Sequence, residues 1–182
     1  MSATTTLMTA EQLLDRVGQG RSELIRGELV ELMPVGQLHG KLVARLLFWL
    51  MIFLEDHPLG SVSTEVGVLL TRDPDLVYGP DILFIAKERD GDPNSPRFYH
   101  GAPDLAVEVL SPEDRAGKVQ EKIRDYLHFG TRLVWLVDPT SRTVTVYHPS
   151  GEAHIYSGND QVTGEDVLPG FSFTPEKLFS AF

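Results

Sequence analysis

The chain has 182 residues, 42% of them hydrophobic and 23% charged, a composition typical of a soluble globular protein with a core of ordinary size. It contains no cysteine, which excludes disulfides and thiolate metal sites. The 26 Asp and Glu residues outnumber the 16 Lys and Arg residues, and the net charge of −10 argues against tight non-specific binding to nucleic acid. An enzyme whose acids bind cations, and whose contacts with nucleic acid are local, is compatible with this charge.

The ends of the chain and its apolar segments predict a cytoplasmic protein that does not span a membrane. The first ten residues contain neither a basic segment nor a long apolar one, so no secretory signal is expected. The longest apolar run, Leu46 to Leu54, has nine residues, well short of the roughly 20 that cross a bilayer. Because no repeat, low-complexity segment or linker divides the chain, we expect one domain over residues 1–182.

The first third of the chain is predicted to form a short helix, a hairpin and a long helix. Thr9 is typical of an N-cap, and the helix that follows it is expected to end by Gly18. Residues 22–31 alternate around Arg26-Gly27, which predicts a hairpin. The longest helical pattern runs from Leu38 to about Asp56. Its second half is apolar nearly all round, so we expect it to be buried or to lie at an interface.

The rest of the chain is predicted to form strands around one further long helix. The sequence from Ser111 to Asp114 favours a helix start, with Ser111 as N-cap and Pro112 at the first helical position. The order of elements predicts an α/β fold in which a mixed sheet is flanked by helices. The expected segments are strand 61–70, turn 71–75, strand 81–85, exposed loop 87–102, strand 104–110, a helix from Ser111 to about Gly130, strands 132–137, 143–147 and 153–156, and helix 175–179.

Glu108 lies in an unusual place for an acid. Leu105 to Leu110 would be a continuous apolar run, the pattern of a strand buried on both faces, if Glu108 did not interrupt it. A buried carboxylate is costly unless it is paired, protonated or bound to a metal. Asp104 points to the same face, but four residues of strand separate the two acids by about 13 Å, too far to bind one ion. Asp104 is therefore expected to serve the start of the strand.

Asp81 is the best partner for Glu108. It begins an apolar strand that can lie beside the strand of Glu108, whereas Asp75, in the preceding turn, is expected to be solvated. A cation is expected on the following helix, where Lys122 lies at the edge of an apolar stripe and its amine can reach the sheet. A surface ion pair of Lys122 with its acidic neighbours is equally compatible, and Lys118, one turn earlier, is the substitute candidate.

Two carboxylates and a lysine at a sheet edge are the groups that metal-dependent phosphodiester hydrolysis needs. The acids can hold a hard divalent cation such as Mg²⁺, which lowers the pKa of an attacking water and neutralises charge on the phosphate. The lysine orients that water or stabilises negative charge in the transition state. A structural Asp–Lys–Glu ion pair would use the same residue types, so the spacing alone leaves both interpretations open.

Several motifs spread over nearly the whole chain add a second line of argument. They are Ser22 to Glu31, His39, Pro80 to Phe84, Pro103 to Pro112, Glu121-Lys122 with Tyr126 and Gly130, Val134 to Pro139, and Leu168 to Phe171. Together they resemble the PD-(D/E)xK nuclease superfamily and, more closely, the bacterial Uma-two family of restriction endonucleases. Each motif alone is unspecific, and the set is specific.

The resemblance implies a restriction endonuclease-like fold and Mg²⁺-dependent hydrolysis of DNA, with Mn²⁺ as an alternative ion. It implies Asp81 and Glu108 as metal ligands, the Val109 backbone carbonyl as a third, and Lys122 as the catalytic cation. The wider superfamily pattern would place that lysine two residues after Glu108, where this chain has Leu110. Uma-two proteins resemble this chain in carrying their lysine on the following helix.

Secondary candidates accompany these residues. His39 has a place near the acids in the family pattern, although packing at the start of its helix is equally compatible. Glu23, Glu28 and Glu31 lie on the hairpin, and one of them can supply a further ligand; Glu28 is kept as a candidate, while surface pairing is expected for any single one. The apolar surface from Phe48 to Phe53, and the need for two cuts in a duplex, predict a homodimer.

A non-catalytic member of the fold, acting as a binding or scaffold module, is the alternative function. The acidic net charge and the leucine at position 110 favour this alternative. The presence of Asp81, Glu108 and Lys122 together favours the enzyme. Binding of Mg²⁺ or Mn²⁺ distinguishes the two, and the sequence does not reveal which DNA would be recognised.

Overall fold

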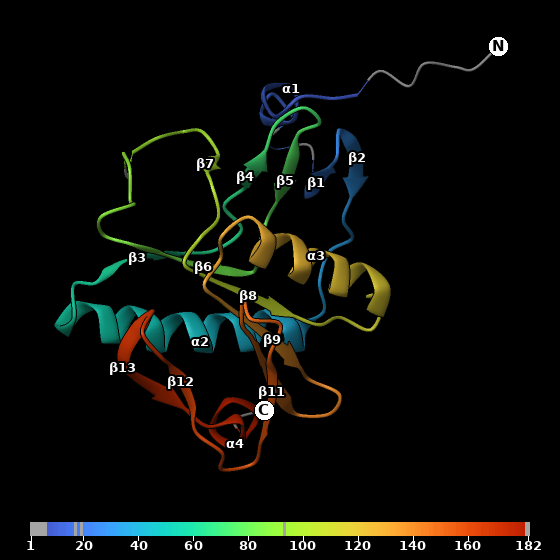
Figure 1. Ribbon diagram of the computed structural model, residues 1–182. Coiled ribbons are helices and arrows are strands. Elements are labelled where there is room, and N and C mark those ends of the chain that lie inside the picture. The colour runs from blue at the N-terminus through green and yellow to red at the C-terminus, as the bar shows by residue number, and fades with distance from the viewer. Residues whose placement is uncertain (1–6, 17, 19, 93, 181–182) are drawn as a thin grey trace.

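The computed structural model describes residues 7–16, 18, 20–92 and 94–180, a mixed α/β fold (Figure 1). The six-stranded sheet has, in spatial order, β11 (Ala153–Ser157), β10 (Thr143–Tyr147), β9 (Leu133–Asp138), β8 (Leu105–Val109), β6 (Ile82–Ala86) and β3 (Gly60–Ser63). The five-stranded sheet has β2 (Glu28–Glu31), β1 (Ser22–Ile25), β5 (Leu76–Tyr78), β4 (Val68–Thr71) and β7 (Tyr99–His100). The other elements are the paired strands β12 (Val162–Gly164) and β13 (Leu168–Phe173) and the helices α1 (Ala10–Leu14), α2 (Gln37–Asp56), α3 (Ala116–His128) and α4 (Pro175–Phe179).

Strand β8 lies inside the six-stranded sheet, where it pairs antiparallel with β6 and parallel with β9. Its side chains alternate between two cores: Leu105, Val107 and Val109 belong to the cluster that includes α2. Ala106 belongs to the cluster that includes α3. The two helices accordingly cover opposite faces of the sheet (Figure 1). Glu108 lies two residues after Ala106 on the same strand, so its side chain points to the same face, toward α3.

The hairpin formed by β1 and β2 agrees with the prediction. Its register pairs Ile25 with Glu28, which leaves a turn of two residues. Arg26 and Gly27 in that turn have φ values of 51° and 82°, the left-handed conformation that such a tight hairpin turn requires. On its other side β1 pairs with β5, and residues 79–81 lead from β5 into β6 of the other sheet. The two sheets therefore meet next to the strand that carries Glu108.

The predicted single strand 61–70 is wrong because the chain changes sheets within it. β3 pairs with β6, whereas β4 pairs with β5 and β7. Between them Glu65 has a φ of 55°, a left-handed conformation that interrupts a continuous strand. Strand β5 has no counterpart in the prediction, nor do β12 and β13, and β7 lies within the segment predicted as an exposed loop.

The predicted helix start at Ser111 is also wrong. Helix α3 begins at Ala116, with Arg115 in the N-cap position. The Asp114 carboxylate accepts a hydrogen bond of 2.7 Å from the Ser111 backbone N–H, and the Asp114 N–H donates back to the Ser111 carbonyl at 3.0 Å. The segment therefore closes as a turn of its own before the helix starts.

Asp75 is buried, which corrects the expectation that it is solvated. Its Oδ2 accepts a hydrogen bond of 2.7 Å from the Ala10 N–H and lies 3.2 Å from the Arg72 guanidinium. The turn before β5 folds against the first turn of α1, and the acid satisfies one of the amides that a helix start leaves without a partner.

Candidate active site

Glu108 meets two side chains of α3. Lys122 Nζ lies 2.8 Å from its Oε1 and 2.9 Å from its Oε2, and the Tyr126 hydroxyl donates a hydrogen bond of 2.8 Å to Oε1. Lys122 and Tyr126 are four residues apart on the helix, so they project from the same face toward the sheet. The lysine is therefore half-buried against the sheet, and its predicted alternative, a surface ion pair with its acidic neighbours, does not apply: Glu121 and Asp125 pair with Arg26 instead.

Lys122 also contacts a second acid, Glu23 of β1. The Glu23 Oε1 lies 2.7 Å from Lys122 Nζ and accepts a hydrogen bond of 3.0 Å from the Gly79 N–H. The ammonium group lies 5.4 Å from the ring centre of Tyr78 and 5.9 Å from that of Tyr126, so two aromatic faces enclose it. One lysine thus connects the five-stranded sheet, through Glu23, to the six-stranded sheet, through Glu108.

Burial dominates the electrostatics of this cluster. It raises the pKa of Glu108 to about 7, against the favourable charge of Lys122 and together with the repulsive charges of Asp81 and Glu23. Burial disfavours the charged form of Lys122 as well, but Glu108 and Glu23 outweigh it and raise the lysine pKa above its ordinary value. The lysine therefore stays protonated, and burial brings the pKa of Glu108 toward neutral pH.

Asp81 is held from two sides at the start of β6. Its Oδ2 accepts a hydrogen bond of 2.7 Å from the Val109 N–H, so the acid is fixed to the residue that follows Glu108. Its Oδ1 lies 3.0 Å from His39 Nε2, and Ser111 Oγ lies 3.3 Å from the other ring nitrogen of His39. Although burial favours the neutral acid, the bonds with His39 and Val109 outweigh it and lower the pKa of Asp81.

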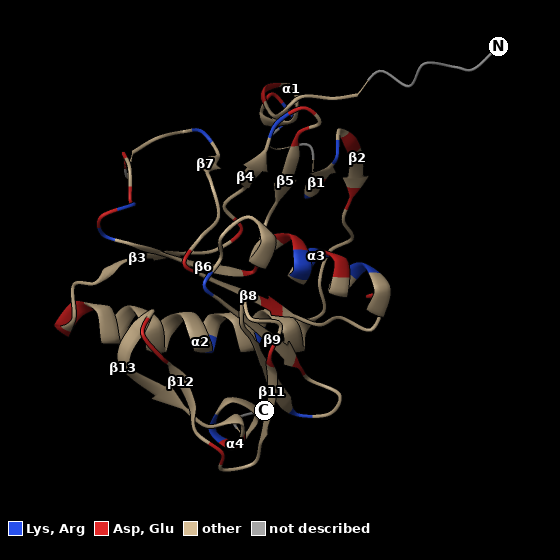
Figure 2. Ribbon diagram, viewed as in Figure 1, with Lys and Arg blue, Asp and Glu red and all other residues tan. Residues whose placement is uncertain are grey.

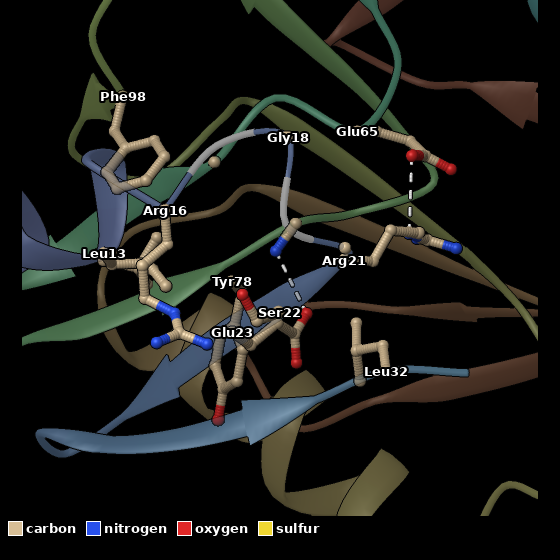
Figure 3. Close-up of a pocket in the computed structure, with 14 residues that line it drawn as sticks. Leu13, Arg16, Gly18, Arg21, Ser22, Glu23, Leu32, Glu65, Tyr78 and Phe98 are labelled. Atoms are coloured by element: carbon tan, nitrogen blue, oxygen red, sulfur yellow. Dashed lines mark hydrogen bonds and ion pairs between the residues drawn. The ribbon is translucent and has the colours of Figure 1, made fainter. Parts of the chain in front are cut away.

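A pocket opens beside this cluster (Figure 3). It has a volume of about 260 Å³, and Glu23 and Gly79 lie in its wall together with Arg21 and Glu65. The Arg21 guanidinium lies 3.3 Å from Glu65 and 3.7 Å from Asp81, so it adds a positive charge beside Asp81. The pocket therefore gives solvent a route to the hairpin side of the cluster.

The donors present fit a hard divalent cation in kind. Asp81, Glu108 and the Val109 carbonyl offer oxygen, the ligand atom that Mg²⁺ prefers. Two carboxylates, Glu23 and Glu108, contact Lys122, and the charges of Asp81 and Glu23 add to burial, the larger cause, in raising the pKa of Glu108. Among the described residues, however, no group of three or more His, Asp or Glu side chains is arranged to hold a metal ion.

The structure brings Lys122 into contact with Glu108, and His39 into contact with Asp81. The hydrogen bond from the Val109 N–H to Asp81 joins the two pairs into one set, and two candidates lie outside it. The Lys118 side chain is 69% exposed and pairs with Glu121 at 3.4 Å. Glu28 is exposed beside the hairpin turn. Within the described part of the chain, neither of them takes part in the contacts that join the set.

Sequence reasoning missed the roles of Glu23, Tyr126 and Arg21. Tyr126 was within reach, because its spacing of four from Lys122 places both on one helical face. For Glu23 the only signal was its position between the strand residues Ser22 and Leu24, which does not distinguish it from the other hairpin acids. Its burial comes from the packing of the hairpin sheet against α3.

The site thus lies in a mixed sheet with helices on both faces, with one acid on the central strand β8 and another immediately before the neighbouring strand β6. Residues 10–176 match the sequence model of the Uma2 (Uma-two) family, described as "Putative restriction endonuclease", and the chain belongs to this family. This confirms the family that the motifs predicted.

The fold is similar to that of a solved structure described as "a putative nuclease belonging to DUF820 from Anabaena variabilis ATCC 29413". The TM-score is 0.81 and the sequence identity 24%, and the match covers 95% of this chain and 98% of that one. It confirms the predicted fold. No curated protein matches the sequence.

Proposed function

We propose that the protein is a divalent-metal-dependent endonuclease that hydrolyses DNA phosphodiester bonds. The observation that carries the proposal is the half-buried contact of Lys122 with Glu108, beside Asp81, which accepts a hydrogen bond from the N–H of Val109. Membership of the family supports nuclease activity in general. Asp81, Glu108 and the Val109 carbonyl would hold Mg²⁺, with Mn²⁺ as the alternative. When bound, the cation would lower the pKa of an attacking water and neutralise charge on the phosphate.

Lys122 is the catalytic cation of this proposal. Its contacts of 2.7 Å with Glu23 and 2.8 Å with Glu108 keep it protonated and fix its direction. A fixed ammonium group can orient a water or stabilise negative charge on a phosphate oxygen without reorganising during the reaction. Glu23 acts through Lys122 and is a positioning residue, as is His39, which acts through Asp81.

Glu108 couples cation binding to protons. Burial raises the pKa of its carboxyl to about 7, so protonated and ionised forms exchange near neutral pH. A cation needs the deprotonated form, so its binding would release that proton and would become tighter as the pH rises.

The DNA contacts of such an enzyme would be local, because the net charge of −10 opposes general attraction to a polyanion. We further propose that the protein is cytoplasmic and acts as a homodimer. The exposed apolar side chains of α2 support the homodimer.

The test is cleavage of supercoiled plasmid DNA in the presence of Mg²⁺ or Mn²⁺. Wild type should nick the plasmid, whereas Glu108→Ala and Lys122→Met should each lose at least a hundredfold in rate. Lys118→Met is the matched control, because it removes an exposed lysine from the same helix and should keep the rate. Cleavage that survives Glu108→Ala would refute the assigned site.

A binding or scaffold module is the second candidate, and one observation favours it. Lys122 occupies both oxygens of Glu108 and is itself neutralised by two acids, which is also the arrangement of a stable structural ion pair. Calorimetry with Mg²⁺ and Mn²⁺ separates the candidates. Heat of binding that disappears in Glu108→Ala supports the nuclease; a wild-type protein that binds neither ion is the scaffold.

A further inference from the structure

Helix α2 carries a stripe of solvent-exposed side chains. One face of the helix is buried in the core and includes Leu42, Leu46 and Leu50. On the opposite face Phe48 and Met51 are 59% and 52% exposed. The stripe consists of Lys41, Ala44, Phe48, Met51, Ile52 and Glu55, which recur at spacings of three and four residues and so lie along one line of the helix.

The two halves of the stripe, on either side of Phe48, are complementary in charge and in side-chain size. Lys41 stands seven residues before Phe48, and Glu55 stands seven residues after it. Ala44 stands four residues before Phe48 and Ile52 four after it, so a small apolar residue mirrors a large one. Figure 2 shows the acids gathered at the C-terminal end of α2. A two-fold axis through Phe48 would therefore bring unlike charges, and unlike sizes, opposite each other.

We propose that the stripe binds the stripe of a second copy of the chain, with the two α2 helices antiparallel and crossing at Phe48. Lys41 then faces the partner's Glu55, and Ala44 faces the partner's Ile52. Each ion pair occurs twice because the interface is isologous. The two ion pairs lie about 21 Å apart along the helix and flank the apolar centre. The inference rests on the homodimer of the proposed function and gives it an orientation, but it does not depend on nuclease chemistry.

The charges argue against the other ways of covering the stripe. A parallel pair of helices would place like charges together at both ends, which is unfavourable. α2 is, within the described part of the chain, a helix long and apolar enough to cross a membrane by length and composition. Its buried leucines, however, belong to the core, and an amphipathic helix on an anionic membrane surface carries basic residues along its polar margin rather than an acidic end.

The first test is the oligomeric state of the full chain, measured by sedimentation equilibrium over a range of concentrations. Wild type should be a dimer, and Phe48→Glu should be a monomer. Ile155→Glu is the control, because Ile155 is 71% exposed on β11, outside the stripe, and its substitution should leave the dimer intact. A wild type that is monomeric at every concentration, or a dimer that Phe48→Glu leaves intact, would overturn the proposal. Binding of the monomer to anionic vesicles would assign the stripe to a membrane instead.

The second test fixes the orientation by charge reversal. Lys41→Glu and Glu55→Lys should each raise the dissociation constant about tenfold, since each replaces two attractive contacts with repulsive ones. The chain with both changes should return to within about twofold of wild type, because the reversed charges again face each other. Thermal melting followed by circular dichroism controls for damage to α2 itself. A double variant no better than either single one would overturn the antiparallel orientation.

The third test uses the absence of native cysteine. Chains with Phe48→Cys alone should be joined by a short bis-maleimide cross-linker. Ala44→Cys and Ile52→Cys chains should be joined only when they are mixed, and cross-linking of Ala44→Cys chains with themselves would indicate a parallel pair. Plasmid cleavage is measured on the same samples. A dimer that lacks nuclease activity refutes the proposed function alone, and an active monomer refutes the dimer alone.

Discussion

The stability of the fold should fall as the pH rises through the range in which Glu108 loses its proton. Burial raises the pKa of this carboxyl from 4.5 to about 7. An acid whose pKa is raised by folding stabilises the folded state fully below pH 4.5, and this contribution is lost as the pH rises to about 7. Since one pKa unit corresponds to about 1.4 kcal/mol, the loss amounts to about 3 kcal/mol of unfolding free energy.

Glu108→Gln isolates this effect, because the amide keeps the size of the side chain and does not titrate. Urea unfolding of wild type and variant at a series of pH values between 4 and 8 measures the difference in unfolding free energy. That difference should change by about 3 kcal/mol in favour of the variant as the pH rises. Glu113→Gln, an exposed acid shortly after the same strand, should change nothing. A flat difference, or one that favours wild type at high pH, would show that Lys122 rather than burial controls Glu108.

Further outcomes follow from the same cluster. Lys122→Met should destabilise the fold by about 3 kcal/mol at neutral pH, measured by urea unfolding, because it leaves two buried carboxylates without a counter-charge; lowering the pH should recover most of the loss. Glu23→Gln should reduce the rate of plasmid cleavage about tenfold and leave Mg²⁺ affinity, measured by calorimetry, within a few-fold of wild type; an equal loss of affinity would make Glu23 a metal ligand. Saturating Mg²⁺ should raise the melting temperature of wild type at pH 8 and leave that of Glu108→Ala unchanged, and a shift in both would place the ion elsewhere.

The parts of the fold that sequence reasoning predicted well are those with a strong local signal. The hairpin is marked by Arg26-Gly27, the long helix by an apolar periodicity, and β8 by its apolar run. The errors lie where a long-range contact decides the structure. Glu65 interrupts a segment of otherwise strand-like composition because the chain passes there from one sheet to the other. Ser111 has the features of an N-cap, yet Asp114 closes a separate turn on it.

The residues of the candidate site also divide into those with a local sequence signal and those that depend on long-range contacts. Asp81 and Glu108 were recognisable because each acid interrupts or adjoins an apolar strand. In the structure Glu108 contacts Lys122, and Asp81 accepts a hydrogen bond from the N–H of Val109. Glu23 was not distinguishable from Glu28, its neighbour on the hairpin, because only the docking of β1 near α3 buries one and leaves the other exposed. Pairing across distant segments is a property of the assembled fold, which local pattern does not encode.

The contact of Lys122 with Glu23 makes the complete site depend on the docking of two segments that lie far apart in the chain. The hairpin is a local structure, but Lys122 lies far along the chain, so the contact between them closes a long loop. A nascent or partly unfolded copy in which the hairpin has not docked would hold Glu108 and Lys122 without their third member. The proposed catalytic arrangement would then be complete only in molecules whose hairpin has docked beside α3.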